Sequence, residues 1–154
     1  MSELFIRQHC IIRRPIDVVR AHFLDFDHHI ENGVHKGVHY TVIERGPRQR
    51  IRQSFRVLGL PKTDELIAYC DDDGSVVNDL IKGDFAGGRI RVAFSKEGET
   101  ATRVEATLSA KLRGINALLA PVVRRVAEKL TIQALEEDRV DLEERGYVPR
   151  ASAL

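Results

Sequence analysis

Cysteine is scarce in this sequence. The 154 residues include two cysteines, Cys10 and Cys70, which are too few for a disulfide framework or for a zinc knuckle built on thiolates. Cys10 falls in an apolar stretch, so we expect it to be a small buried hydrophobic residue. A chain without disulfides is typical of a reducing compartment, and we therefore expect a cytoplasmic protein.

Long apolar runs are also missing. They are far shorter than the roughly 20 residues that span a bilayer, so the sequence predicts no membrane span. The opening stretch, MSELFIRQHCIIRRP, does not place a basic segment before an apolar one, and we expect no signal peptide. Basic and acidic residues nearly balance, at 24 and 23. They are interleaved, so we expect no face that binds nucleic acid.

The composition is 43% hydrophobic and 31% charged, which is typical of a globular domain with an apolar core. We expect residues 1–154 to form a single domain. Residues 4–13 are rich in β-branched side chains and predict a first strand that ends before Pro15. Pro15 suits the first turn of a helix over 15–25, and a second short helix follows through Asn32.

The middle of the chain predicts six more strands, at 38–44, 48–58, 64–70, 75–82, 88–96 and 102–112. Side chains in 48–58 alternate in polarity, which indicates an antiparallel strand with one wet, basic face. The inward side chains are Ile51, Gln53, Phe55 and Val57. The outward side chains are Arg50, Arg52, Ser54 and Arg56.

From Asn116 to Gly146 the pattern becomes helical, and it predicts one long helix with Gly146 as its C-cap. One stripe of this helix carries Leu119, Val123, Val126, Leu130, Ala134 and Asp138. Residues 148–154 are expected to be a frayed tail. The predicted class is therefore α+β, with a curved antiparallel sheet of about seven strands around a long C-terminal helix.

This order of elements, together with RRPIDVVRAHFLDFD at residues 13–27, resembles the helix-grip fold of the START-like (SRPBCC) superfamily, which includes pollen-allergen-like proteins and polyketide cyclases. The resemblance implies a cavity between sheet and helix that binds a hydrophobic small molecule, such as a lipid, a polyketide or an aromatic compound. Gln53 and Asn78 could orient this ligand or be satisfied buried polar groups. Candidate cavity walls, which core packing would explain equally well, are Phe55, Tyr69, Ile81, Phe94, Val104 and Leu108.

Histidine is concentrated in one stretch, DFDHHIENGVHKGVH, which holds four of the chain's six histidines. Histidine is a common metal ligand and titrates near neutral pH, so the stretch predicts a metal or proton-transfer site. The candidate ligands are His29 (or its neighbour His28 in its place), His35 and His39. In a flat strand His35 and His39 would lie roughly 13 Å apart, so both could bind one ion only if Gly37 bends the chain. The isolated His9 and His22 are interpreted as structural.

The segments NGVHKGVH (32–39) and ALEEDRVDLE (134–143) resemble the iron-binding segments of Rieske non-haem iron oxygenases. The resemblance implies a mononuclear Fe(II) site of two histidines and one carboxylate, with Asp138 as the carboxylate. Zn(II) could use the same ligands. Asp138 also falls on the apolar stripe, where a bare carboxylate is costly. The paired Cys and His motifs of a Rieske iron–sulfur cluster are missing, so an oxygenase would need an external electron donor.

Several alternatives stay open. The histidines could form a surface cluster that binds nothing, and Asp138 could pair with Arg139. The same histidines could act without metal as a base in a cyclase or dehydratase. A binding module for a hydrophobic molecule therefore competes with an enzyme, either metal-dependent (oxygenase-like or hydrolytic) or metal-free. The glycine-rich segment 83–88 lies between predicted strands and not before a helix, so it does not predict a phosphate site.

Overall fold

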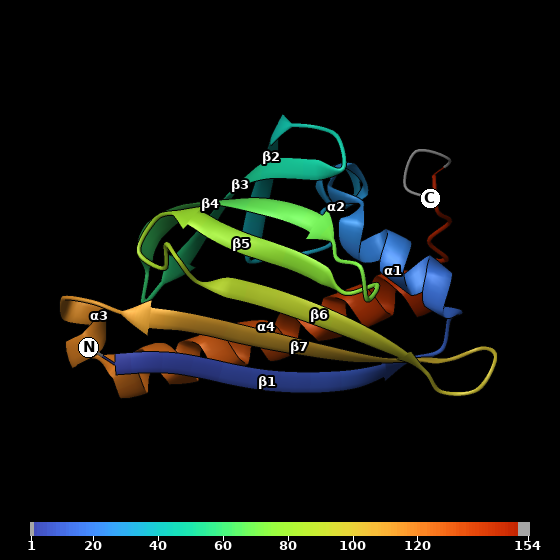
Figure 1. The fold of residues 1–154 in the computed structure, drawn as a ribbon. Coiled ribbons are helices and arrows are strands. Elements are labelled where there is room, and N and C mark those ends of the chain that lie inside the picture. Colours follow the sequence, from blue (N-terminus) through green and yellow to red (C-terminus); the bar gives the residue numbers. More distant parts are fainter. Residues whose placement is uncertain (1, 151–154) are drawn as a thin grey trace.

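The computed structural model describes residues 2–150 as a curved antiparallel sheet around one long helix (Figure 1). The seven strands are β1 (Ser2–Ile12), β2 (Val38–Glu44), β3 (Arg48–Val57), β4 (Leu60–Cys70), β5 (Val76–Lys82), β6 (Arg89–Lys96) and β7 (Thr102–Leu112). The helices are α1 (Ile16–Leu24), α2 (Phe26–Asn32), α3 (Ile115–Leu118) and α4 (Ala120–Glu143). The strand order is β1-β7-β6-β5-β4-β3-β2. The predicted α+β helix-grip architecture is confirmed.

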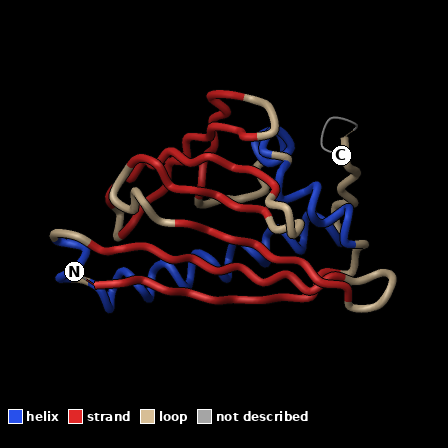
Figure 2. Tube along the Cα trace, in the orientation of Figure 1, coloured by secondary structure: helices blue, strands red, loops and turns tan. Residues whose placement is uncertain are grey.

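The first strand, β1, is an edge strand of the sheet and pairs with the last strand, β7. Ser2 lies opposite Leu112 and Ile12 opposite Thr102, so β1 and β7 pair along their whole length. Figure 2 shows these two long strands running beneath the shorter ones, with α4 along the same side of the sheet. Leu4 and Ile6 of β1 are 2% exposed and pack with Val123 of α4. This packing joins the first strand and the long C-terminal helix in one apolar cluster.

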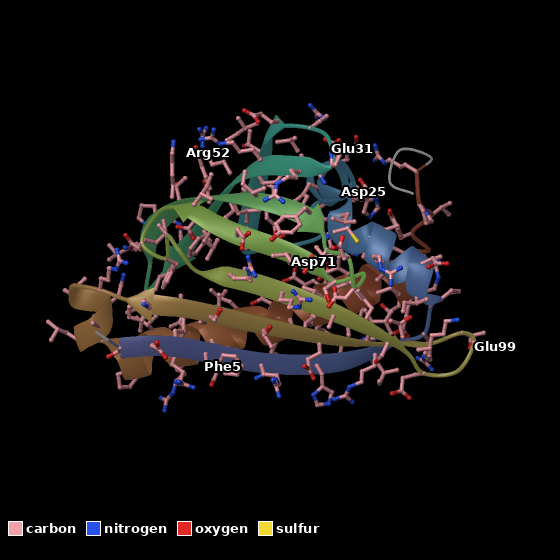
Figure 3. All side chains as sticks on the ribbon, in the orientation of Figure 1. Phe5, Asp25, Glu31, Arg52, Asp71 and Glu99 are labelled. Atoms are coloured by element: carbon pink, nitrogen blue, oxygen red, sulfur yellow. The ribbon has the colours of Figure 1, made fainter. Side chains whose placement is uncertain are left out.

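Strand β3 has the two faces that its sequence predicts. Ile51 is fully buried on the concave side. On the convex side, Arg50 Nη2 and Arg52 Nη2 lie 2.6 and 3.1 Å from carboxylate oxygens of Glu65 on β4. These hydrogen bonds lower the pKa of Glu65 to about 2. Figure 3 shows Arg52 projecting away from the sheet.

The sequence predicts one helix over 116–146, but the structure has two helices in this region. Leu119 leaves helical geometry and separates the short α3 from the 24-residue α4. Pro121 then falls in the first turn of α4, where its missing N–H leaves no helical hydrogen bond unmade. In the described residues, no helix combines the length and apolar character that a bilayer crossing requires.

The segment after α4 is anchored to α2, although the sequence predicts fraying from residue 148. Tyr147 is 3% exposed, and the Arg150 guanidinium pairs with Glu31 of α2. Val148 between them is exposed. Figure 3 places Asp25 and Glu31 beside this segment. Residues 151–154 of the predicted tail lie outside the described residues.

The two cysteines are not paired. Cys10 is half-buried and packs against the core cluster that contains Ile12 and Val104. Burial raises the pKa of its thiol to about 11, so the thiol stays protonated at neutral pH. Cys70 is exposed at the end of β4.

Candidate functional site

A cavity of about 230 Å³ lies between the concave face of the sheet and α4. Its wall is mainly apolar, and all seven strands, α1, α2, α4 and the segments that follow α2 and β5 contribute to it. The side chains that line it include Tyr40, Phe55, Val57, Leu80, Phe85, Ile90, Leu108, Val126, Leu130 and Ala134. Such a cavity suits an apolar molecule that bears few polar groups.

Of the six predicted wall residues, Phe55 and Leu108 line this cavity. Tyr69 and Ile81 do not: the Tyr69 hydroxyl donates to Asp79 at 3.0 Å near the convex-face residue Arg89, and Ile81 is 42% exposed. Alternation along β5 explains the second case, because Leu80 takes the inward position next to Ile81.

The remaining two predicted wall residues belong to the packed core. Phe94 packs edge-on against Phe23, with ring centroids 5.4 Å apart. Val104 is fully buried in the same cluster of side chains. The core-packing alternative therefore describes Phe94 and Val104, and neither is among the residues that line the cavity.

His29, His35 and Asp138 form a polar group in the cavity wall. Asp138 Oδ1 lies 3.1 Å from His29 Nε2 and 3.2 Å from His35 Nε2. Asp138 is 3% exposed, and burial by itself favours the neutral carboxyl. When the nearby imidazoles are protonated, the charge of His35 and the hydrogen bonds from His29 and His35 outweigh that effect and hold the pKa of Asp138 well below its usual range. The structure thus brings together three of the predicted metal ligands.

The ring of His29 is held by Asp25, the residue that caps α2. Asp25 Oδ1 accepts a hydrogen bond from the His28 backbone N–H at 3.0 Å. The Asp25 carbonyl oxygen lies 2.8 Å from His29 Nδ1. A carbonyl oxygen only accepts, so Nδ1 carries a proton. In the neutral ring Nε2 then has a free lone pair, and this lone pair faces Asp138.

A second carboxylate, Asp141, lies one turn further along α4. Its Oδ2 is 2.8 Å from His22 Nε2 and 2.6 Å from His28 Nε2. The Asn32 amide nitrogen lies 3.1 Å from His28 Nδ1 and donates to it, so His28 donates to Asp141 through Nε2. Burial alone would raise the pKa of Asp141, but the hydrogen bonds from His22 and His28 lower it to about 2.

His22, interpreted from the sequence as structural, links the two carboxylates. It is fully buried, and burial lowers its pKa. Its Nε2 donates to Asp141, which leaves the Nδ1 lone pair free. Nδ1 has no hydrogen-bond partner and lies 3.7 Å from Asp138 Oδ1. A signal for His22 was present in the sequence, because it shares a helical stripe with the apolar Val18 and Val19, just as Asp138 lies on an apolar stripe.

His39, a predicted ligand, is not part of this cluster. It is exposed on β2, between Val38 and Tyr40, which both line the cavity. Neighbouring residues of a strand point to opposite faces, so His39 faces solvent. His35 reaches the cluster because it precedes the strand.

Two structural features expected of the simpler alternatives are absent from the described residues. His29 and Asp138 are 7% and 3% exposed, so this is not a surface patch. Arg139 does not pair with Asp138. Instead, Arg139 Nε donates to Glu136 at 2.9 Å, one turn earlier on the solvent side of α4.

The donor set suits a transition metal. A ligand atom from each of His22, His29 and Asp138 lies within 4.8 Å of the other two. Two imidazole nitrogens and one carboxylate oxygen are ligands that Fe(II) and Zn(II) accept. The orphaned Nδ1 of His22 and the backbone-held ring of His29 fit this interpretation, because a ligating histidine commonly donates its other N–H to a fixed oxygen.

Comparisons with known proteins concern the fold. No protein-family model and no curated protein matches the sequence. The protein TTHA0849 from Thermus thermophilus is similar in structure, with a TM-score of 0.81 and 22% identity, covering 95% of this chain and 100% of that one. The Zhui aromatase/cyclase from Streptomyces sp. R1128 has a TM-score of 0.78 and 13% identity, covering 96% and 100%. A START superfamily protein from Mycobacterium smegmatis has a TM-score of 0.68 and 16% identity, covering 92% and 95%.

At these identities the likeness establishes the fold alone. The chain has the helix-grip fold that these START-like and aromatase/cyclase structures share. The resemblance to the Rieske oxygenases stays a prediction.

Proposed function

We propose that this protein binds a hydrophobic small molecule in the cavity beneath its sheet, next to a single metal ion held by His22, His29 and Asp138. His35 faces the same carboxylate from the cavity wall and is the fourth candidate ligand. A bound Fe(II) or Zn(II) ion would act as a Lewis acid on an oxygen atom of the ligand. An oxygenase reaction would also require electrons from another protein.

The observation that carries the metal is the direction of the lone pairs. His29 Nδ1–H donates a hydrogen bond to the Asp25 carbonyl oxygen, and His22 Nε2–H donates one to the Asp141 carboxylate. The opposite nitrogens of the two neutral rings then face the Asp138 carboxylate, which also offers only lone pairs. A cation among these three groups removes the repulsion. A second proton on the His29 ring would also remove the repulsion, and metal analysis distinguishes a bound ion from this proton.

The cavity itself supports the hydrophobic ligand. Aromatic and aliphatic side chains form most of its wall, and the polar groups are few and grouped. The aromatase/cyclase and START structures that share the fold point in the same direction. The class of molecule that we propose is a lipid, a polyketide or an aromatic compound.

Metal analysis of protein purified without a histidine tag tests the site. We expect close to one Fe or Zn per chain. Asp138→Ala and His29→Ala should lose this metal. His39→Ala, which removes the exposed histidine on β2, is the matched control and should retain it. Protein that stays metal-free after incubation with Fe(II) or Zn(II) would contradict the metal site and favour the proton.

Binding of N-phenyl-1-naphthylamine, a neutral dye that fluoresces in apolar surroundings, tests the cavity. We expect saturable binding to the wild-type protein. Ala134→Phe, which places a ring in the cavity from α4, should abolish it. Equal binding by this variant would contradict the cavity as the ligand site.

A second candidate is acid–base catalysis without metal, as in a cyclase or dehydratase. His35 favours it, because this side chain lines the cavity. Burial alone would lower its pKa, but the charge of Asp138 outweighs burial and raises it. A histidine base would exchange the acidic C–H protons of a bound aryl ketone such as 2-acetonaphthone. NMR in deuterated water would detect this exchange, and His35→Ala should lack it.

A further inference from the structure

A second polar group lies in the cavity wall, on strands that do not carry the histidine cluster. Gln53 of β3 and Asp64 of β4 are opposite each other in the sheet, and both line the cavity. Their neighbours in the wall include Phe55, Val57 and Phe85, which are apolar. The pair is therefore a polar spot in an apolar surface.

Asp64 is buried without the partners that a buried carboxylate requires. It is 2% exposed, and the hydrogen bond that it accepts, from Gln53 Nε2, is 3.5 Å long. A carboxylate offers about four acceptor positions. The nearby Lys62 ammonium is bonded to Asp84 instead. Desolvation raises the pKa of Asp64, as expected for a carboxyl group that its surroundings do not satisfy.

The backbone makes room for this carboxylate. Gly83 follows β5 with a φ of +107°, and a Cβ atom there would lie 1.9 Å from Asp64 Oδ1. Any other residue would collide with the carboxylate in this arrangement. The glycine at position 83 therefore leaves the space that the Asp64 carboxylate occupies, although the apolar packing around it does not require a carboxylate there.

We propose that Asp64, assisted by Gln53, accepts a hydrogen bond from a hydroxyl group of the cavity ligand. This inference rests on the proposed binding function and narrows its ligand to an apolar molecule that carries an alcohol or a phenol. A ligand hydroxyl supplies the donor that Asp64 lacks, and its apolar body covers the surrounding wall. A ligand carboxylate would be repelled by Asp64, so fatty acids and other anionic lipids are disfavoured.

Three naphthalenes of similar shape test the hydroxyl preference: naphthalene, 2-naphthol and 2-naphthoate. At neutral pH we expect the wild-type protein to bind 2-naphthol about tenfold more tightly than naphthalene, as one hydrogen bond to a charged group allows. We expect 2-naphthoate to bind more weakly than naphthalene. The measurement is competition with the fluorescent dye N-phenyl-1-naphthylamine.

Asp64→Leu should remove the preference for 2-naphthol over naphthalene, because the variant has no acceptor for the hydroxyl group. Asp64→Asn, which keeps the shape but not the charge, should bind 2-naphthoate more tightly than the wild-type protein does. Asp72→Asn, on the exposed turn after β4, is the matched control and should behave as wild type. If Asp64→Leu and Asp64→Asn keep the wild-type order of affinities, the inference is wrong. If the wild-type protein does not bind naphthalene, the proposed cavity function fails instead.

Discussion

The hydroxyl of Tyr147 donates a hydrogen bond of 2.9 Å to the carboxylate of Asp25. The two residues are 3% and 6% exposed, so this bond is buried. The Tyr147 ring also packs against the rings of His22 and His28, with centroids 4.8 and 4.6 Å away. Asp25 in turn caps α2 and holds the His29 ring. Tyr147, near the end of the described chain, thus supports Asp25, which orients the proposed metal ligand His29.

Tyr147→Phe should lower the free energy of unfolding by about 1–2 kcal/mol, because the buried Asp25 carboxylate loses a donor while the ring packing remains. Urea-induced unfolding measures this change. Val148→Ala, at an exposed neighbour, should have no effect. Equal stability of Tyr147→Phe and the wild-type protein would show that the hydrogen bond contributes nothing.

Acid should destabilise the protein partly through Asp141. Its folded pKa of about 2 is below the usual value of about 3.9. Between pH 3.9 and pH 2, roughly, the unfolded chain therefore binds more protons than the folded chain. The contribution of Asp141 to stability is complete above this pH range and is lost as the pH falls through it. Asp141→Asn should show a smaller loss of stability between pH 4 and pH 2, measured by urea unfolding at each pH. Glu65→Gln, on the convex face, is a comparison variant because its pKa is also about 2. A pH profile of Asp141→Asn that is parallel to wild type would contradict this role.

Gly83→Ala should destabilise the fold by about 2–4 kcal/mol, since it adds both backbone strain and a collision with Asp64. Gly87→Ala is the matched control. Gly87 also has a positive φ, of +88°, but a Cβ atom there meets nothing within 4 Å. We expect about 1 kcal/mol for this control, measured by thermal unfolding. A Cβ atom at Gly83 would also lie 2.9 Å from the Thr63 carbonyl oxygen, so similar losses in the two variants would mean that both Asp64 and this backbone segment move aside easily.

Leu58→Asn should stabilise the protein by about 0.5–1 kcal/mol. Leu58 has a φ of +51° in the turn between β3 and β4 and is 65% exposed. Asparagine tolerates this backbone conformation better than leucine does, and little apolar contact is lost. Leu60→Asn, at the first residue of β4, should not stabilise. Thermal unfolding of the two variants decides the matter, and a loss of stability in Leu58→Asn would indicate that Leu58 packs against another part of the protein.

Much of the fold follows from patterns that one strand or helix carries by itself. The alternation in 48–58 correctly assigned the faces of β3, because each residue there is clearly polar or apolar. Asp138 was identified for a similar reason, as a charge on an apolar stripe. Residues 64–70 gave no such pattern. Asp64 is charged but lines the cavity, and the apolar Ile67 alternates with the buried Leu66, so side-chain polarity did not indicate that Tyr69 lies on the outer face.

The site was harder to predict because it depends on contacts between distant segments. His22 fits an apolar core as readily as a metal site until Asp138 and Asp141 are placed beside it. His39 has the same side chain as His35, and only the start of β2 between them directs one to the cluster and the other to solvent. The metal and the ligand stay predictions.

Because α1, α2 and the segment after α2 supply the imidazoles and α4 supplies both acids, the cluster cannot assemble until α4 has been synthesised. β1 likewise waits for β7, its only partner in the described sheet. A nascent chain that ends before α4 lacks one wall of the cavity and the Asp138 carboxylate of the proposed metal site. The proposed ligand and ion can therefore bind only after α4 has joined the sheet.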